Sequence, residues 1–206
     1  MKPIAAQEFL AQPLRVHAFL EGVPLHDVWA VNLPCAQEGV TLSEYFRRTS
    51  KKGSQRKIAW PARALLGFRF FLGRIFGWDK DLHGKGQASF ADRITSEDRE
   101  ESLVPPGTVE GLFRVVYSFE NEALRETANG TVHGAVLLAL VPAERGYRLY
   151  FAVYVRKVSW FTPVYMGLIG PFRRWIVYPA LFRQIQDSWN REFGVARTMD
   201  TPSKEG

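Results

Sequence analysis

The stretch that decides the fold is residues 112–156, LFRVVYSFENEALRETANGTVHGAVLLALVPAERGYRLYFAVYVR. It holds four successive runs rich in β-branched and aromatic residues, at 112–119, 123–128, 131–141 and 147–156. Short turn signals separate the runs, which is typical of consecutive antiparallel strands. Asn129-Gly130 is the strongest of these signals, because both central positions of a type I′ turn require a positive φ. The stretch therefore predicts an antiparallel sheet.

The turns also predict which side chains share a face of that sheet. A two-residue turn at Asn129-Gly130 sets Glu126 opposite His133, and a turn through 142–146 sets Leu137 opposite Phe151. Because side chains alternate along a strand, these registers define an inner and an outer face. The inner face would carry Leu124, Ala135, Leu137, Ala139, Leu149, Phe151 and Val153. The outer face would carry Val136, Leu138, Leu140, Tyr150 and Tyr154.

The segments before the sheet predict two further strands, two helices and a short strand. Extended stretches lie at 15–20 and 26–33, and the capping-box pattern Thr41-Leu-Ser-Glu44 predicts a short helix to about residue 48. Pro61 can begin a second helix over 61–77, and a short strand is expected at 88–94. We expect the 61–77 helix or the N-terminal strands to cover the apolar outer face, with homodimerisation as the second explanation.

A long amphipathic helix is predicted from Thr162-Pro163 to Gly194. At 100° per residue, one arc carries Trp175, Tyr178, Phe182, Ile185, Trp189 and Phe193. Gly170-Pro171 is expected to interrupt or kink this helix, and Pro179 to bend it. A curved antiparallel sheet that wraps around this helix would let both bury their apolar sides. We therefore predict an α+β helix-grip fold, with one domain over 1–194 and a polar tail over 195–206.

The same segments resemble a known family. SFADRITSEDREESLVPPGT at 89–108, the strands quoted above and the start of the C-terminal helix are similar to an uncharacterised bacterial family of unknown function. That family is related to the START-like (SRPBCC) superfamily of helix-grip proteins. The resemblance covers about residues 88–190 and implies an architecture with an internal cavity. It implies no reaction, because unrelated functions share one fold.

Composition limits the classes of protein and the location. The chain has 206 residues, 46% hydrophobic, with a formal net charge of +6 and a single cysteine, Cys35. One cysteine excludes an internal disulfide framework, and His17, His26 and His83 show no metal-ligand spacing, so no metal or cofactor is expected. No signal peptide is recognisable, and the most apolar stretch, 158–182, has Arg173-Arg174 at its centre, which argues against a transmembrane segment. We expect a cytoplasmic protein.

The first candidate site is an apolar cavity between the sheet and the C-terminal helix. Its expected lining is Phe113, Tyr117, Leu137, Phe151, Trp175, Tyr178, Phe182 and Trp189. Such a lining suits a flat or lipid-like ligand, although the same residues build a filled core equally well. The leading hypothesis is therefore a protein that binds a hydrophobic small molecule or lipid.

Two alternatives remain open. Glu126 beside His133 could serve as an acid/base pair in a cyclase or hydrolase-type enzyme, or simply as a structural cross-strand pair. Basic segments, at 47–57 and at Arg173-Arg174 beside Trp160, Phe161 and Trp175, could contact a membrane surface or a protein partner. No recognised nucleic-acid-binding module is present, so no nucleic acid is expected as a partner.

Overall fold

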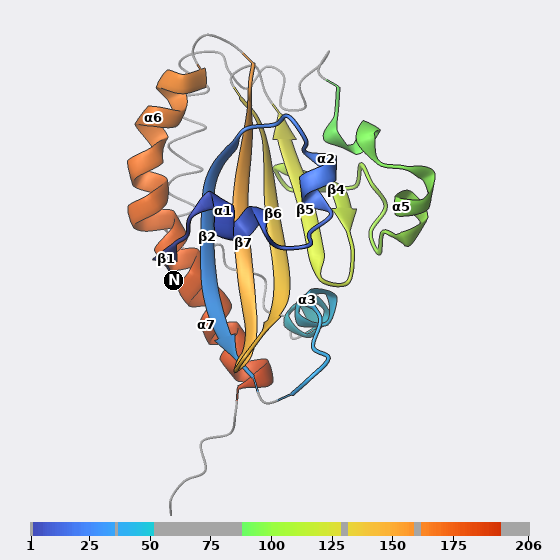
Figure 1. The fold of residues 1–206 in the computed structure, drawn as a ribbon, viewed down its shortest axis with the longest axis vertical. Helices are drawn as coiled ribbons and strands as arrows, with labels where there is room; N and C mark the ends of the chain where they lie inside the picture. The colour runs from blue at the N-terminus through green and yellow to red at the C-terminus, as the bar shows by residue number, and fades with distance from the viewer. Residues whose placement is uncertain (1, 36, 52–87, 129–131, 159–161, 195–206) are drawn as a thin grey trace, which may run out of the picture.

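A computed structural model describes residues 2–35, 37–51, 88–128, 132–158 and 162–194. The architecture is α+β, with a seven-stranded antiparallel sheet in the order β1-β2-β7-β6-β5-β4-β3 and a long C-terminal helix (Figure 1). The strands are β1 (Lys2–Pro3), β2 (Leu25–Pro34), β3 (Val109–Glu110), β4 (Phe113–Ser118), β5 (Glu122–Ala128), β6 (Val132–Ala143) and β7 (Gly146–Lys157). The helices are α1 (Ala6–Leu10), α2 (Val16–Phe19), α3 (Leu42–Lys51), η2 (Phe90–Arg93), α5 (Ser96–Glu101), α6 (Thr162–Phe172), η3 (Arg173–Val177) and α7 (Tyr178–Phe193).

Both faces of the sheet are covered. Figure 1 shows α1 crossing the near face while α7 passes behind β2. On the near face, Phe9 of α1 lies 5.9 Å from Tyr150 of β7, measured between ring centroids. On the far face, Phe182 of α7 lies 5.6 Å from Phe151 of β7. The sheet is therefore the middle layer between two apolar clusters.

The β6–β7 hairpin differs from the prediction by one residue. Leu137 pairs with Ala152 instead of Phe151, because the hairpin closes through two residues, Glu144 and Arg145. Gly146 makes this tight turn possible: its φ is 117°, and a Cβ there would lie 2.6 Å from the carbonyl oxygen of Leu33. A one-residue slip moves every side chain of a strand to the other face, so the predicted inner and outer faces are wrong for β7.

The β5–β6 hairpin is shifted by two residues and keeps its faces. Ala128 pairs with His133, so Glu126 faces Ala135 instead of His133. Residues 129–131 themselves lie outside the described part of the chain. Since a shift of two preserves the alternation of side chains, Leu124 and Leu137 share a face as expected.

The predicted outer patch is consequently divided between the two faces. Tyr150 and Tyr154 belong to the near-face cluster under the N-terminal segment. Leu140 belongs to the far-face cluster, against which Val136 and Leu138 also pack. The five residues therefore do not form one exposed apolar surface, and a second subunit is not needed to cover them.

Local patterns before the sheet are confirmed in part. β2 and α3 match the predicted strand and helix. The Glu44 N–H donates to Thr41 Oγ1 at 3.2 Å, which is one half of the predicted capping box, while the Glu44 carboxylate accepts from Arg48. Two expected strands are wrong: 16–19 is the helix α2, and 90–93 is a 3₁₀ turn, η2. In that turn Ser89 caps the N-terminus by accepting from the Ala91 N–H. The predicted 61–77 helix lies outside the described residues.

The C-terminal helix begins and ends where predicted, and its irregular turn directly precedes Pro179 instead of lying at Gly170-Pro171. α6 continues through Pro171 to Phe172, and a wide π-helical turn, η3, joins it to α7. Pro179 explains this position, because a proline lacks the N–H and its ring clashes with the carbonyl four residues earlier, here that of Trp175. Among the described residues, no helix is both long and apolar enough to cross a bilayer.

Candidate functional site

The structure does not bring the eight predicted cavity residues together. Phe151, Tyr178, Phe182 and Trp189 meet between β7 and α7. Tyr117 and Leu137 lie in the near-face cluster, on the opposite side of the sheet. Phe113 begins β4, near the β3 edge of the sheet. The expected common lining is therefore wrong, chiefly because the β7 slip changed which face Phe151 occupies.

Trp175 does not join the other predicted cavity residues, for a different reason. It is 78% exposed, whereas every other member of its predicted arc is buried. Trp175 lies inside the π-helical turn, where the angular step per residue differs from that of an α-helix. Extrapolating a 100° step through this turn therefore misplaces the side chain.

The four residues that do meet form a packed core. The Phe151 and Tyr178 ring centroids are 5.2 Å apart at an interplanar angle of 68°. Trp189 is fully buried and donates from Nε1 to the Pro34 carbonyl oxygen at 3.0 Å. Edge-to-face contacts at these spacings are those of a filled aromatic core. The space under α7 is thus occupied by side chains.

An open groove lies instead under the other half of the helix, between α6 and the adjoining ends of β2 and β7. Its volume is about 610 Å³. Its lining is Pro24, Leu25, His26, Val155, Lys157, Thr162, Pro163, Met166, Gly167, Gly170, Pro171, Arg174 and Trp175. The lining is mainly apolar, and its basic groups come from both the strands and the helix.

Two glycines keep the groove open. A Cβ added at Gly167 or at Gly170 would have no atom within 4 Å. Neither glycine has a positive φ, so the helix itself does not require glycine at these positions. Glycine costs about 1 kcal/mol relative to alanine inside a helix. Both glycines therefore make the helix less stable than alanine would, and both leave open space beside the sheet.

A buried carboxylate and two arginines lie where α6 passes into α7. Asp27 of β2 is buried, and its side chain accepts from Arg173 and Arg174 of η3. The Arg174 Nη2–Asp27 Oδ1 distance is 2.7 Å, and Arg174 Nε lies 3.1 Å from the same oxygen. The Tyr178 hydroxyl donates to Asp27 Oδ2 at 3.4 Å. This cluster, called the Asp27 cluster below, fixes the end of the groove.

His26 borders both the groove and the Asp27 cluster. Its Nε2 lies 3.8 Å from Asp27 Oδ2. Burial lowers the pKa of His26 below its usual value, and the positive charges of Arg173 and Arg174 lower it further, against the opposing effect of Asp27. His26 is thus held toward its neutral form, so the positive charge at this end comes from the arginines.

Glu126 and His133 make direct contact on the near face, as the sequence predicts, although they lie diagonally across the strands. His133 Nε2 is 3.0 Å from Glu126 Oε2, and both side chains are almost completely buried. Glu126 also accepts from the Ser89 hydroxyl and from the Phe90 N–H at 2.8 Å. The His133 ring stacks on Phe90 with centroids 4.1 Å apart. The pair therefore ties the 89–93 segment to the sheet.

The electrostatics of this pair favour an ionised carboxylate. Burial acts to raise the pKa of Glu126, but the hydrogen bonds from His133, Ser89 and Phe90 outweigh it, and the pKa is lowered overall. His133 Nδ1 is buried without a hydrogen-bond partner among the described residues. The adjacent cavity has a volume of about 20 Å³, which is enough for one water molecule but not for a substrate.

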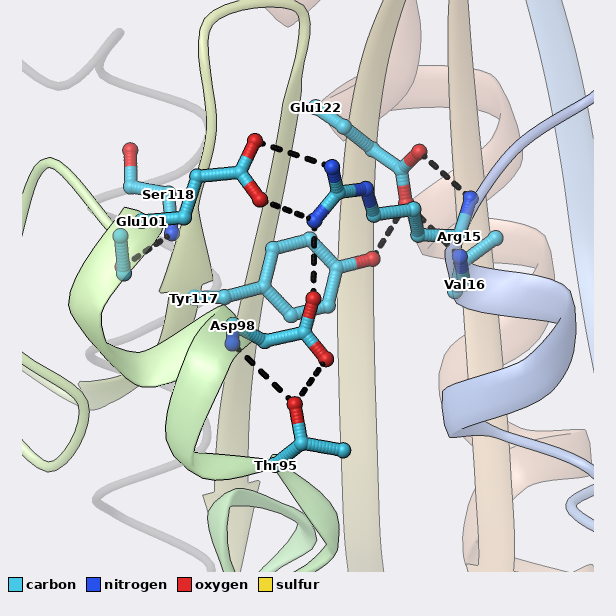
Figure 2. Close-up of polar contacts among 9 residues, drawn as sticks. Arg15, Val16, Thr95, Asp98, Glu101, Tyr117, Ser118 and Glu122 are labelled. Carbon is cyan, nitrogen blue, oxygen red and sulfur yellow. Dashed lines mark hydrogen bonds and ion pairs between the residues drawn. The ribbon is translucent and has the colours of Figure 1, made fainter.

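A third buried carboxylate, Glu122, anchors the N-terminal segment (Figure 2). It accepts from the backbone N–H groups of Arg15 and Val16 at 2.9 and 2.8 Å and from the Tyr117 hydroxyl. Figure 2 also shows the Arg15 guanidinium between Glu101 and Asp98 of α5. These contacts join α2, α5 and β5, so Glu122 has a structural role.

Sequence reasoning missed Asp27 and the two glycines of α6. A signal for Asp27 was present, since Asp27 alternates in phase with Trp29, Val31 and Leu33, the side of β2 that is otherwise apolar. A charge in such a row requires a partner. The glycines carry no comparable signal, because glycine inside a helix is equally compatible with close packing.

The comparison with known families places the chain in a group defined by sequence. Residues 19–180 match the model described as protein of unknown function (DUF2867), so the chain belongs to this family. No curated protein matches the chain. The matched range includes β2, the whole β4–β7 sheet, α6 and the Asp27 cluster. Among the residues that the structure describes, no group of three or more His, Cys, Asp or Glu side chains could hold a metal ion.

Proposed function

We propose that this protein binds a hydrophobic small molecule or lipid in the groove between α6 and the ends of β2 and β7. The observation that carries the proposal is the groove itself. Its volume of about 610 Å³ lies within the range of about 300–1,000 Å³ typical of ligand sites. Leu25, Val155 and Met166 provide apolar contact on its walls.

The position of the groove supports the same proposal. It lies between the sheet and the C-terminal helix, where the START-like resemblance implies a cavity. The proposal therefore includes a START-like relationship for this fold, with the ligand site displaced toward the first half of the helix. The aromatic residues under α7 then serve as the packed base of the domain and make no ligand contact.

Native mass spectrometry of the freshly purified protein tests this proposal. We expect an apolar ligand on the wild type and on Gly167→Ala, and none on Gly167→Leu, whose side chain would fill the groove. Gly167→Ala is the matched control, because it makes the same change in helix propensity with only one added carbon. An equal amount of bound ligand on Gly167→Leu would place the site elsewhere.

A second candidate function is contact with a membrane surface. Trp175, which lines the groove, and its neighbour Ile176 are both exposed, beside the half-exposed Arg174. Tryptophan next to a basic residue is typical of membrane interfaces. Sedimentation with anionic vesicles across a salt series tests this role: binding should weaken as salt increases and should be lost in Trp175→Ala.

The enzyme alternative receives less support from the geometry. Glu126 and His133 are paired, yet the cavity beside them, as lined by the described residues, has a volume of only about 20 Å³, far below that of the groove. Turnover that is lost in His133→Ala, in a folded variant, would restore this alternative.

A further inference from the structure

The Asp27 cluster carries more positive than negative charge. Arg173 and Arg174 share the single carboxylate of Asp27, which leaves one positive charge in excess, and His26 is held toward its neutral form. Among the residues that the structure describes, the remaining polar group that faces Asp27 is the neutral Tyr178 hydroxyl. A buried cluster with an unbalanced charge is costly unless a counter-charge or solvent compensates it. The excess charge lies beside the groove.

Arg174 is the member of the cluster that reaches the groove. It lines the groove and its side chain is 50% exposed, whereas that of Arg173 is only 12% exposed. Its contacts with Asp27 use Nε and Nη2, so at least three of the five N–H donors of a guanidinium are not used by Asp27. Asp27 holds the guanidinium in one orientation, which lowers the entropy cost of binding a further ligand group.

We infer that the ligand of the groove carries an oxyanion, a carboxylate or a phosphate, on its apolar tail, and that Arg174 binds this group at the Asp27 end. The inference rests on the proposed function, since it assigns the polarity of the ligand in the same groove. The apolar tail would extend along Met166 and Gly167, away from Arg174. Asp27 acts as a positioning residue that holds Arg174.

Lys157 lies at the other end of the groove and is the alternative residue that could bind the oxyanion. It lies four residues beyond Val153, the partner of Asp27 in the β2–β7 register. At about 3.3 Å per residue, the two ends are about 13 Å apart along the strand. Arg174 is the better anion site, because a guanidinium held by a carboxylate binds oxyanions bidentately, whereas a lysine side chain is a mobile point charge.

Isothermal titration with dodecanoate, dodecanol and dodecyl phosphate tests the inference. For the wild type we expect one or both anions to bind about tenfold to a hundredfold more tightly than dodecanol, as a charge-assisted hydrogen bond predicts. The relative affinities for dodecanoate and dodecyl phosphate distinguish a fatty-acid carboxylate from a lipid phosphate. Arg174→Gln should abolish the preference for the anions while binding dodecanol with wild-type affinity.

Arg183→Gln is the matched control, because it removes the same charge from an exposed position on the same helix, and it should keep the preference. A preference that survives in Arg174→Gln, or that is lost in Lys157→Gln instead, would overturn the assignment. If dodecanol binds as tightly as both anions, the inference fails and the proposed function stands. If none of the three binds the wild type, the proposed function fails as well.

Discussion

The two halves of the C-terminal helix meet the same sheet in different ways. α7 presents Phe182, Ile185 and Trp189 to the sheet, and these buried side chains pack there in one apolar cluster. α6 presents Gly167 and Gly170, and a groove of about 610 Å³ remains. Both halves belong to one helix that packs on one sheet, but their side chains differ in volume where they face the sheet. One half supplies stability, and the other leaves room for a ligand.

The largest expected effect comes from the closed half. Trp189→Ala should lower the free energy of unfolding by about 3–5 kcal/mol, because it removes a fully buried indole and its hydrogen bond to Pro34. Trp175→Ala, in the open half, should change it by less than about 0.5 kcal/mol, since this indole is exposed. Urea titrations of both variants measure the difference. Equal losses of unfolding free energy in the two variants would contradict the distinction between a closed α7 half and an open α6 half.

Asp27 joins the two halves and should rank next. Asp27→Asn leaves Arg173 and Arg174 without their counter-charge, which should destabilise the fold by about 3 kcal/mol, the lower end for breaking a buried ion pair, because Arg174 is half exposed. Thermal unfolding measures this loss. A wild-type melting temperature for Asp27→Asn would show that the arginines need no carboxylate.

Substitution of Glu126, on the near face, should have a smaller effect on the free energy of unfolding, and this effect should depend on pH. Glu126→Gln should cost about 1–3 kcal/mol at neutral pH, because it weakens the hydrogen bonds that hold Ser89 and Phe90. The pKa of Glu126 is lowered in the folded state, so its contribution is complete above its ordinary value of 4.5 and is lost as the pH falls through the folded pKa. The gap between wild type and Glu126→Gln should therefore narrow in acid. A gap that is constant down to pH values near 2 would contradict this pKa direction.

The smallest change in stability is expected at Gly167. Gly167→Ala should stabilise the protein by up to about 1 kcal/mol, because alanine is the better helix former and its Cβ enters open space. Denaturant titration measures the change. Destabilisation by this single carbon would mean that the groove is already filled.

The longer strands and helices could be predicted from the sequence, but many of the contacts between them could not. β2, α3, the four central strands and the extent of the C-terminal helix follow from hydrophobic periodicity and turn residues. The α2 and η2 helices were missed, because they are a single turn each and are held by long-range contacts to Glu122 and Glu126. No local pattern contains those partners.

The site was less predictable than the fold for two physical reasons. The faces of β7 depend on whether the hairpin turn holds two residues or five, and Gly146 permits the shorter turn through its positive φ. The π-helical turn then changes the phase of the helix at Trp175. The β7 register and the helix phase each differ from the prediction by about one residue, and each difference changes which side chains meet. The Glu126–His133 contact was predicted correctly, because the β5–β6 register differs by two residues and so keeps both side chains on one face.

Above all, we propose that the α6 half of the helix holds a ligand in the groove that Trp175 lines. The most direct measurement is the quenching of Trp175 fluorescence by 2-bromododecanoate, whose bromine lies next to the carboxylate, taken as the difference between the wild type and Trp175→Phe. We expect saturable quenching in the wild type and in Gly167→Ala, and none in Gly167→Leu. Saturable quenching that persists in Gly167→Leu, or that is identical in the wild type and Trp175→Phe, would contradict it.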